Sequence, residues 1–131
     1  MAQVLVDTSA IYALIDKDDG HHRRAVAIFR SLLRQGLTPF ITNFIVAESH
    51  ALLLSRLGAA TARAWLLNQI WPVEPVNLVD EEKAKEIIRR YIDKTFSYTD
   101  AASFALMDRL GVRQAFAFDP HFQQYGLKVL T

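Results

Sequence analysis

Four carboxylates stand at positions where a soluble chain seldom leaves an unpaired charge. Asp7 and Asp119 each follow a short apolar run, so each is expected to end a buried strand. Glu48 lies within an apolar segment, and Asp100 begins a stretch with helical spacing. Burial of an unpaired carboxylate is costly, or it forces the group to stay protonated. We therefore expect the four side chains to converge on a bound cation.

The chemistry open to such a cluster is that of a hard divalent cation. Mg²⁺ takes oxygen ligands, and a set of carboxylates in a chain without cysteine suits Mg²⁺ or Mn²⁺ better than zinc. Such ions activate water and stabilise the leaving oxygen of a phosphodiester. Carboxylates alone would repel a polyanion, so basic residues are needed beside the metal. The candidates for this role are Arg23, Arg24, Arg89 and Arg90.

Each acid also has a plainer interpretation. Asp7, Asp100 and Asp119 could serve only as helix caps or turn residues. Glu48 is harder to explain without a metal, because no basic residue lies three or four positions away to pair with it. Thr8, Ser9 and Thr99 also stand near these acids, and we expect them to cap helices, bond ligand waters or orient carboxylates. A surface or structural role is expected for His121, with substrate contact as the alternative. His21, His22 and His50 are not expected as ligands.

The elements that must position these acids alternate along the chain. Short apolar runs predict strands, and apolar residues spaced three and four apart predict helices. Strands are predicted at 3–7, 39–42, 73–78, 114–118 and 128–130. Helices are predicted at 9–15, 22–35, 43–57 with Asn43 as N-cap, 60–70, 80–92 with Asp80 as N-cap, 99–110, and a short turn at 120–125. This order predicts an α/β fold, a three-layer αβα sandwich around a parallel sheet of about five strands. Ligands of such sheets bind beyond the carboxyl ends of the strands.

Composition places the chain among single-domain globular proteins. It has 131 residues, of which 51% are hydrophobic and 22% charged, and its formal net charge is +1. One domain over residues 1–131 is therefore expected. The absence of cysteine excludes disulfides and thiolate metal sites, and it fits a cytoplasmic location. No apolar stretch is long enough to span a membrane, and the first residues do not have the pattern of a signal peptide.

Three segments of the chain resemble a known family. They are VLVDTSAIYALID, ITNFIVAESHALLLSRLG and SYTDAASFALMDRLGVRQAFAFDPHF, and they contain the four acids. Together they are similar to PIN-domain proteins of the VapC type, the ribonuclease toxins of type II toxin–antitoxin pairs. The resemblance implies metal-dependent endonucleolytic cleavage of RNA, with Asp7 and Asp100 as principal metal ligands and Glu48 and Asp119 completing the cluster. It also implies a cognate antitoxin protein as partner and a homodimer.

Other functions make distinct demands on the same sequence. A haloacid-type phosphatase needs Asp-x-Asp after its first strand, but this chain has Asp7-Thr8-Ser9. A receiver domain needs a lysine after a late strand, where this chain has Phe118-Asp119-Pro120. A non-catalytic module that binds RNA or protein stays open as the alternative, and a titration with Mg²⁺ or Mn²⁺ would distinguish it from a nuclease.

Overall fold

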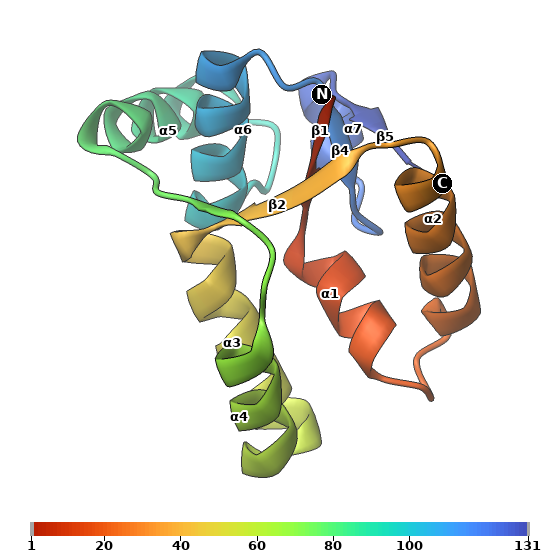
Figure 1. Cartoon of the computed structure of the whole chain (residues 1–131). Helices are drawn as coiled ribbons and strands as arrows, with labels where there is room; N and C mark the ends of the chain where they lie inside the picture. Colours follow the sequence, from red (N-terminus) through yellow and green to blue (C-terminus); the bar gives the residue numbers. More distant parts are fainter. Residues whose placement is uncertain (1, 131) are drawn as a thin grey trace.

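Five parallel strands form one sheet, with the N-terminal strand at its centre (Figure 1). The computed structural model describes residues 2–130. The strand order is β3-β2-β1-β4-β5, and every pairing is parallel. The strands are β1 (Gln3–Val6), β2 (Thr38–Thr42), β3 (Val73–Glu74), β4 (Gln114–Phe116) and β5 (Lys128–Val129). The predicted parallel sheet of about five strands is thereby confirmed.

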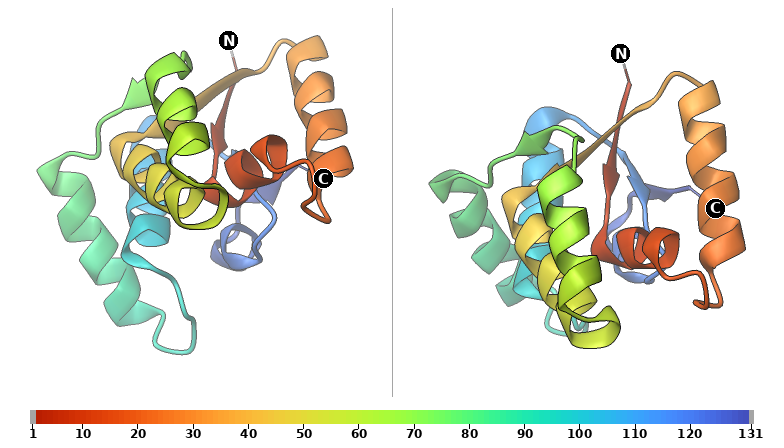
Figure 2. Two further views of the ribbon diagram at one scale, coloured as in Figure 1. Left: turned by 90° about the horizontal axis from the view of Figure 1, so that it is seen from below. Right: turned by 60° about the horizontal axis from the view of Figure 1, so that its bottom comes forward.

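Helices cover both faces of this sheet. The connections that step from β1 to β2 and on to β3 run one way, whereas those that return to β4 and β5 run the other way. The helices are α1 (Thr8–Ile15), α2 (His22–Arg34), α3 (Asn43–Leu57), α4 (Ala59–Asn68), α5 (Leu78–Arg90), α6 (Tyr98–Leu110) and α7 (His121–Tyr125). Figure 2 shows α2 and α5 on opposite sides of the strands, as right-handed crossovers in the two directions require. Helix α3 contacts both α1 and α6.

The core lies between the central strands and the helices that cover them. In β1, Val4, Leu5 and Val6 are fully buried. In α6, every residue from 101 to 107 is buried, because this helix is apolar on nearly all sides. Phe104 of α6 meets Phe122 of α7 edge to face, with ring centroids 5.0 Å apart. This contact fixes α7 against α6 and thereby brings the end of β4 close to the start of α6.

The predicted N-caps of two helices were wrong by one to three residues. Thr42 caps α3, because its Oγ1 accepts a hydrogen bond of 3.0 Å from the Ile45 amide. Helix α5 begins two residues earlier than predicted, at Leu78. Its cap is Asn77, and Asp80 is the third helical residue of a capping box.

Asp80 therefore has a structural role that differs from the predicted one. Its carboxylate is 2% exposed and accepts two hydrogen bonds of 2.9 Å from Arg109 of α6. The pair joins α5 to α6. Helix α5 ends at Arg90 rather than at Ile92. The prediction that Ile92 packs on the apolar side of this helix was wrong, because Ile92 is 91% exposed.

The large apolar residues of α3 and α4 are only partly buried, since Leu66 is 39% and Leu67 66% exposed. Trp65 of α4, and Trp71 beyond its end, are partly buried and pack against the core. In the Leu52–Leu54 run, Leu53 is buried and Leu54 is 46% exposed. None of the helices in residues 2–130 is both long and apolar enough to cross a membrane.

Candidate active site

The carboxyl ends of β1 and β4 lie side by side and bring Asp7 and Asp119 to one edge of the sheet. Asp7 follows β1 directly, and its amide donates a hydrogen bond of 2.9 Å to the carbonyl of Phe116, the last residue of β4. Burial of the Asp7 side chain raises its pKa well above the ordinary value, and the negative charges of Asp119 and Asp100 raise it further. The sequence prediction that these ends share an edge is met.

Ser9 holds Asp7 in place at the start of α1. The Asp7 carboxylate caps this helix, since its Oδ2 accepts hydrogen bonds from the Ser9 amide at 3.2 Å and from the Ser9 hydroxyl at 2.8 Å. The Ser9 hydroxyl in turn accepts from the amide of Phe118 at 2.9 Å. A single hydroxyl therefore ties the end of β1 to the segment that follows β4. Asp7 therefore caps α1 and also interacts with the other acids of the cluster.

Asp100 enters the cluster from the first turn of α6. Its Oδ2 accepts from the Ser97 amide at 3.1 Å, and its own amide donates to the Ser97 hydroxyl at 3.0 Å, which forms a capping box. The same Oδ2 lies 2.7 Å from Nδ1 of His121. Burial raises the pKa of Asp100 and the charge of Asp119 raises it too, whereas the Ser97 amide and His121 act in the opposite direction.

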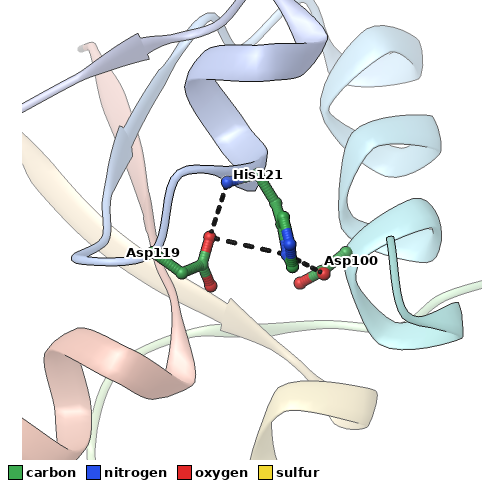
Figure 3. A group of neighbouring side chains, drawn as sticks. All are labelled: Asp100, Asp119 and His121. Atoms are coloured by element: carbon green, nitrogen blue, oxygen red, sulfur yellow. Dashed lines mark hydrogen bonds and ion pairs between the residues drawn. The ribbon is translucent and has the colours of Figure 1, made fainter. Parts of the chain in front are cut away.

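His121 links Asp100 to Asp119 (Figure 3). Its amide donates to Oδ1 of Asp119 at 3.0 Å, and its Nδ1 lies 3.9 Å from the same oxygen. When Asp100 is ionised, Nδ1 must carry the proton in their contact, because an ionised carboxylate can only accept. One donor atom from each of these three residues lies within 4.8 Å of the others, an arrangement that can hold a metal ion.

The sequence interpretation gave His121 a structural role and did not foresee this position. The signal available was its place two residues after Asp119, at the start of a short helix. Its contact with Asp100, 21 positions away, depends on how α7 packs against α6 and has no local sequence pattern.

Glu48 faces the cluster from α3, on the side of Asp100. It is half-buried, and burial raises its pKa, as do the charges of Asp100 and Asp119. The hydroxyls of Thr8 and Thr99 act in the opposite direction and lower the pKa of Glu48. The ion pairs found in residues 2–130 do not include Glu48, in line with the expectation that no basic side chain accounts for it.

The structure brings the four acids together only in part. In residues 2–130, Asp100 and Asp119 offer ligand atoms within 4.8 Å of each other and of His121, whereas Asp7 and Glu48 lie outside this group. The charges of Asp100 and Asp119 nevertheless act on both Asp7 and Glu48. The donors of the close group are two carboxylates and the imidazole of His121. This donor set fits Mg²⁺ or Mn²⁺, which prefer oxygen and tolerate a nitrogen ligand. The mutual repulsion that raises the pKa of Asp7 and Asp100 is also what a bound cation would relieve.

The basic residues near the acids are only in part those expected. Arg24 lines a cavity of about 320 Å³ that also contains Asp119, whereas Arg89 is paired with Glu86 on its own helix. Arg56 was not singled out from the sequence. It lines a second cavity next to Asp119, of about 270 Å³, at the far end of α3.

Comparisons with known proteins agree with this architecture. The family model described as PIN domain matches residues 4–128. The 23S rRNA-specific endonuclease VapC20 of Mycobacterium tuberculosis is 34% identical over 126 residues, which is 94% of each chain. The crystal structure of that VapC20, titled a sarcin–ricin loop cleaving toxin, superposes with a TM-score of 0.87 and covers 95% of both chains at 31% identity.

A more distant structure shares the fold alone. The crystal structure of FitAcB from Neisseria gonorrhoeae superposes with a TM-score of 0.72 at 18% identity and covers 98% of this chain and 96% of that one. The family-model match over nearly the whole chain and the identity to VapC20 reach the same conclusion independently. This chain belongs to the PIN-domain family.

Proposed function

We propose that this protein is a metal-dependent endoribonuclease, with residues 1–131 forming a single nuclease domain. The observation that carries the proposal is that Asp100 and Asp119 offer ligand atoms within 4.8 Å of each other, while burial and the charges of both raise the pKa of Asp7 and of Glu48. The similarity to an endonuclease specific for 23S rRNA over 94% of the chain supports RNA as the substrate.

The residues have separable roles in this proposal. Asp7 and Asp100 would be the principal ligands of Mg²⁺ or Mn²⁺, and Asp119 and Glu48 would complete the site directly or through water. A bound divalent cation supplies an activated water and stabilisation of the leaving oxygen. The raised pKa of Glu48 suits it to accept a proton from the attacking water, because a base works best when its pKa lies close to the working pH. His121 fixes the orientation of Asp100.

The proposed nuclease also has proposed partners. VapC20, to which this chain is similar, is described as a toxin. This similarity supports the existence of a cognate antitoxin protein that inhibits the proposed nuclease. A homodimer and a cytoplasmic location stay predictions from the sequence.

The test is a cleavage assay on total RNA and on purified 23S rRNA. Wild type should cleave with Mg²⁺ or Mn²⁺ and stop in excess EDTA. Asp7→Asn should lower the rate by a hundredfold or more, since metal ligation contributes several kcal/mol to catalysis. Its fold should persist, because asparagine keeps an acceptor for the Ser9 amide and caps helices well.

Asp18→Asn is the matched control, since Asp18 is exposed in the turn after α1 and its loss removes the same charge. It should cleave like wild type. Full activity of Asp7→Asn, or of wild type in EDTA, would refute the proposal. RNA binding without cleavage in any metal would favour the non-catalytic alternative.

A further inference from the structure

A hollow of about 270 Å³ adjoins the acidic cluster on the side of α1 and α3. It shares Ser9 and Asp119 with the cluster, and its walls include Tyr12, His21 and Arg56. A group bound in this hollow would therefore lie directly beside the proposed position of the cleaved bond. None of these three wall residues has a part in the chemistry described above.

One wall of the hollow is an aromatic pair. The His21 ring stacks on the Phe118 ring, with centroids 4.5 Å apart and an angle of 17° between the planes. His21 is exposed, and its side chain makes no capping hydrogen bond to α2. Phe118 is fixed from behind, because the Ser9 hydroxyl accepts from its amide. Because Ser9 also donates to Asp7, the backbone of Phe118 has a fixed position relative to Asp7, and the exposed His21 ring stacks on Phe118 beside the cluster.

A guanidinium group also lines the hollow. Arg56, in the last turn of α3, lies over the Tyr12 ring at 5.1 Å from the centroid. The ion pairs found in residues 2–130 do not include Arg56. Asp16 lies close enough for the charge of Arg56 to lower its pKa, but its carboxylate accepts a hydrogen bond of 2.5 Å from the Tyr12 hydroxyl.

Asp19 is the other acid in the hollow besides Asp119, and it has a local partner. Its Oδ2 accepts a hydrogen bond of 3.0 Å from the His21 amide, which holds the turn before α2. Neither Asp16 nor Asp19 forms an ion pair with Arg56 in residues 2–130, so the guanidinium can bind an anion that enters the hollow. An aromatic surface and an arginine in one hollow are the pairing that single-stranded nucleic acid binds, with a base stacked and a phosphate paired.

We propose that this hollow binds one unpaired nucleotide next to the scissile phosphodiester. The base stacks on the exposed face of His21, and Arg56 contacts the adjoining phosphate. The proposal rests on the proposed function and deepens it, since it limits the substrate to RNA that is single-stranded beside the cleaved bond. A paired base cannot offer its face in this way, because its neighbours in the helix already cover it.

The test measures RNA binding apart from cleavage. A fluorescent single-stranded RNA oligonucleotide of mixed sequence is titrated, by anisotropy in Mg²⁺, into the Asp7→Asn protein and into variants made on that background. His21→Ala should weaken binding about tenfold, the loss typical of one stacked base, whereas His21→Phe should stay within about twofold. Arg56→Ala should weaken binding about tenfold and flatten the dependence of log K on log salt by about 0.7.

Arg63→Ala is the matched control. Arg63 is exposed on α4, so this substitution removes the same positive charge at a position outside the hollow. It should bind within about twofold of the parent. The same oligonucleotide annealed to its complement should bind more weakly and should lose the effect of His21→Ala. Circular dichroism melts establish that each variant is folded.

RNA cleavage is then measured for the same substitutions made in the wild-type protein, and the results distinguish the subsite proposal from the nuclease proposal. If wild type cleaves RNA while His21→Ala and Arg56→Ala bind and cleave like Arg63→Ala, the subsite is wrong and the nuclease proposal stands. If both substitutions weaken binding but wild type does not cleave, the nuclease proposal is wrong, the position beside a cleaved bond falls with it, and the hollow stands as a nucleotide-binding site alone. RNA binding by none of the proteins overturns both.

Discussion

Asp119→Asn should stabilise the metal-free protein although it damages the proposed active site. The substitution removes one negative charge from the cluster and changes little else. Asparagine retains an oxygen that can accept the hydrogen bond from the His121 amide, now 3.0 Å long. The remaining effect is the loss of repulsion between Asp119 and the buried carboxylates of Asp7 and Asp100.

The size of the effect follows from distance and exposure. The ligand atoms of Asp100 and Asp119 lie within 4.8 Å of each other, at which two like charges repel by about 3.5 kcal/mol in a medium of effective dielectric constant about 20. The Asp119 side chain is 30% exposed, and water screens part of this repulsion. A gain of about 1 to 2 kcal/mol remains, which corresponds to a rise in melting temperature of roughly 3 to 8 °C.

The effect should depend on pH in a defined direction. Burial first, and then the charge of Asp119, raise the pKa of Asp100 in the folded protein. Below the ordinary pKa of an aspartate, Asp100 is protonated in both folded and unfolded chains and is not repelled. As the pH rises through the raised pKa, the wild-type fold loses stability, and Asp119→Asn loses less. The difference between the two proteins should thus be small near pH 4 and largest above pH 7.

The assay is thermal unfolding in EDTA from pH 4 to pH 8, repeated with Mg²⁺. Metal binding stabilises a protein by about 2.7 kcal/mol at a hundred times its Kd, so wild type should gain more from Mg²⁺ than Asp119→Asn does. Asp18→Asn serves as the control for net charge. Equal or lower stability of Asp119→Asn in EDTA at pH 7.5 would refute the electrostatic reasoning, as would an equal gain of both proteins from Mg²⁺.

Two further substitutions test contacts that position the site and stabilise the fold. Ser9→Ala removes the hydroxyl that joins Asp7 to Phe118. It should lower the free energy of unfolding in urea by about 1 to 2 kcal/mol and the metal affinity, measured by calorimetry, by about tenfold. Unchanged metal affinity would contradict the positioning role of Ser9. Arg109→Met leaves Asp80 buried without its partner and should cost about 2 kcal/mol, less than a fully buried pair because Arg109 is 37% exposed, while RNA cleavage stays near wild type.

The parallel sheet and its number of strands could be predicted from the sequence, but the order of the strands in the sheet and the ends of the strands could not. The apolar runs and helical spacings are local, whereas the strand order β3-β2-β1-β4-β5 depends on packing between distant segments. Strand β3 stops after two residues because Pro75 has no amide hydrogen to donate. Strand β4 stops at Phe116 because the Phe118 amide donates to Ser9 rather than to a neighbouring strand.

The acidic cluster was predictable for a physical reason. Charge that follows an apolar run has few uses in a soluble protein, so Asp7, Glu48 and Asp119 stand out in the sequence itself. His121 and Arg56 do not stand out in this way. Exposed histidines and arginines are common, and only the packing of α7 on α6 and of α3 beside α1 gives these two a place near the acids.

The central position of β1 has a consequence for when activity can arise during synthesis. β1 is made first, yet its neighbour β4 and the carboxylate of Asp119 come from the end of the chain. The hydrogen bond between Phe118 and Ser9 spans 109 positions, and closing so long a loop costs entropy before any contact repays it. A nascent or truncated chain that ends before β4 cannot assemble the cluster. On the proposed function, the nuclease would stay inert until the ribosome has passed Asp119 and β4 can pair with β1.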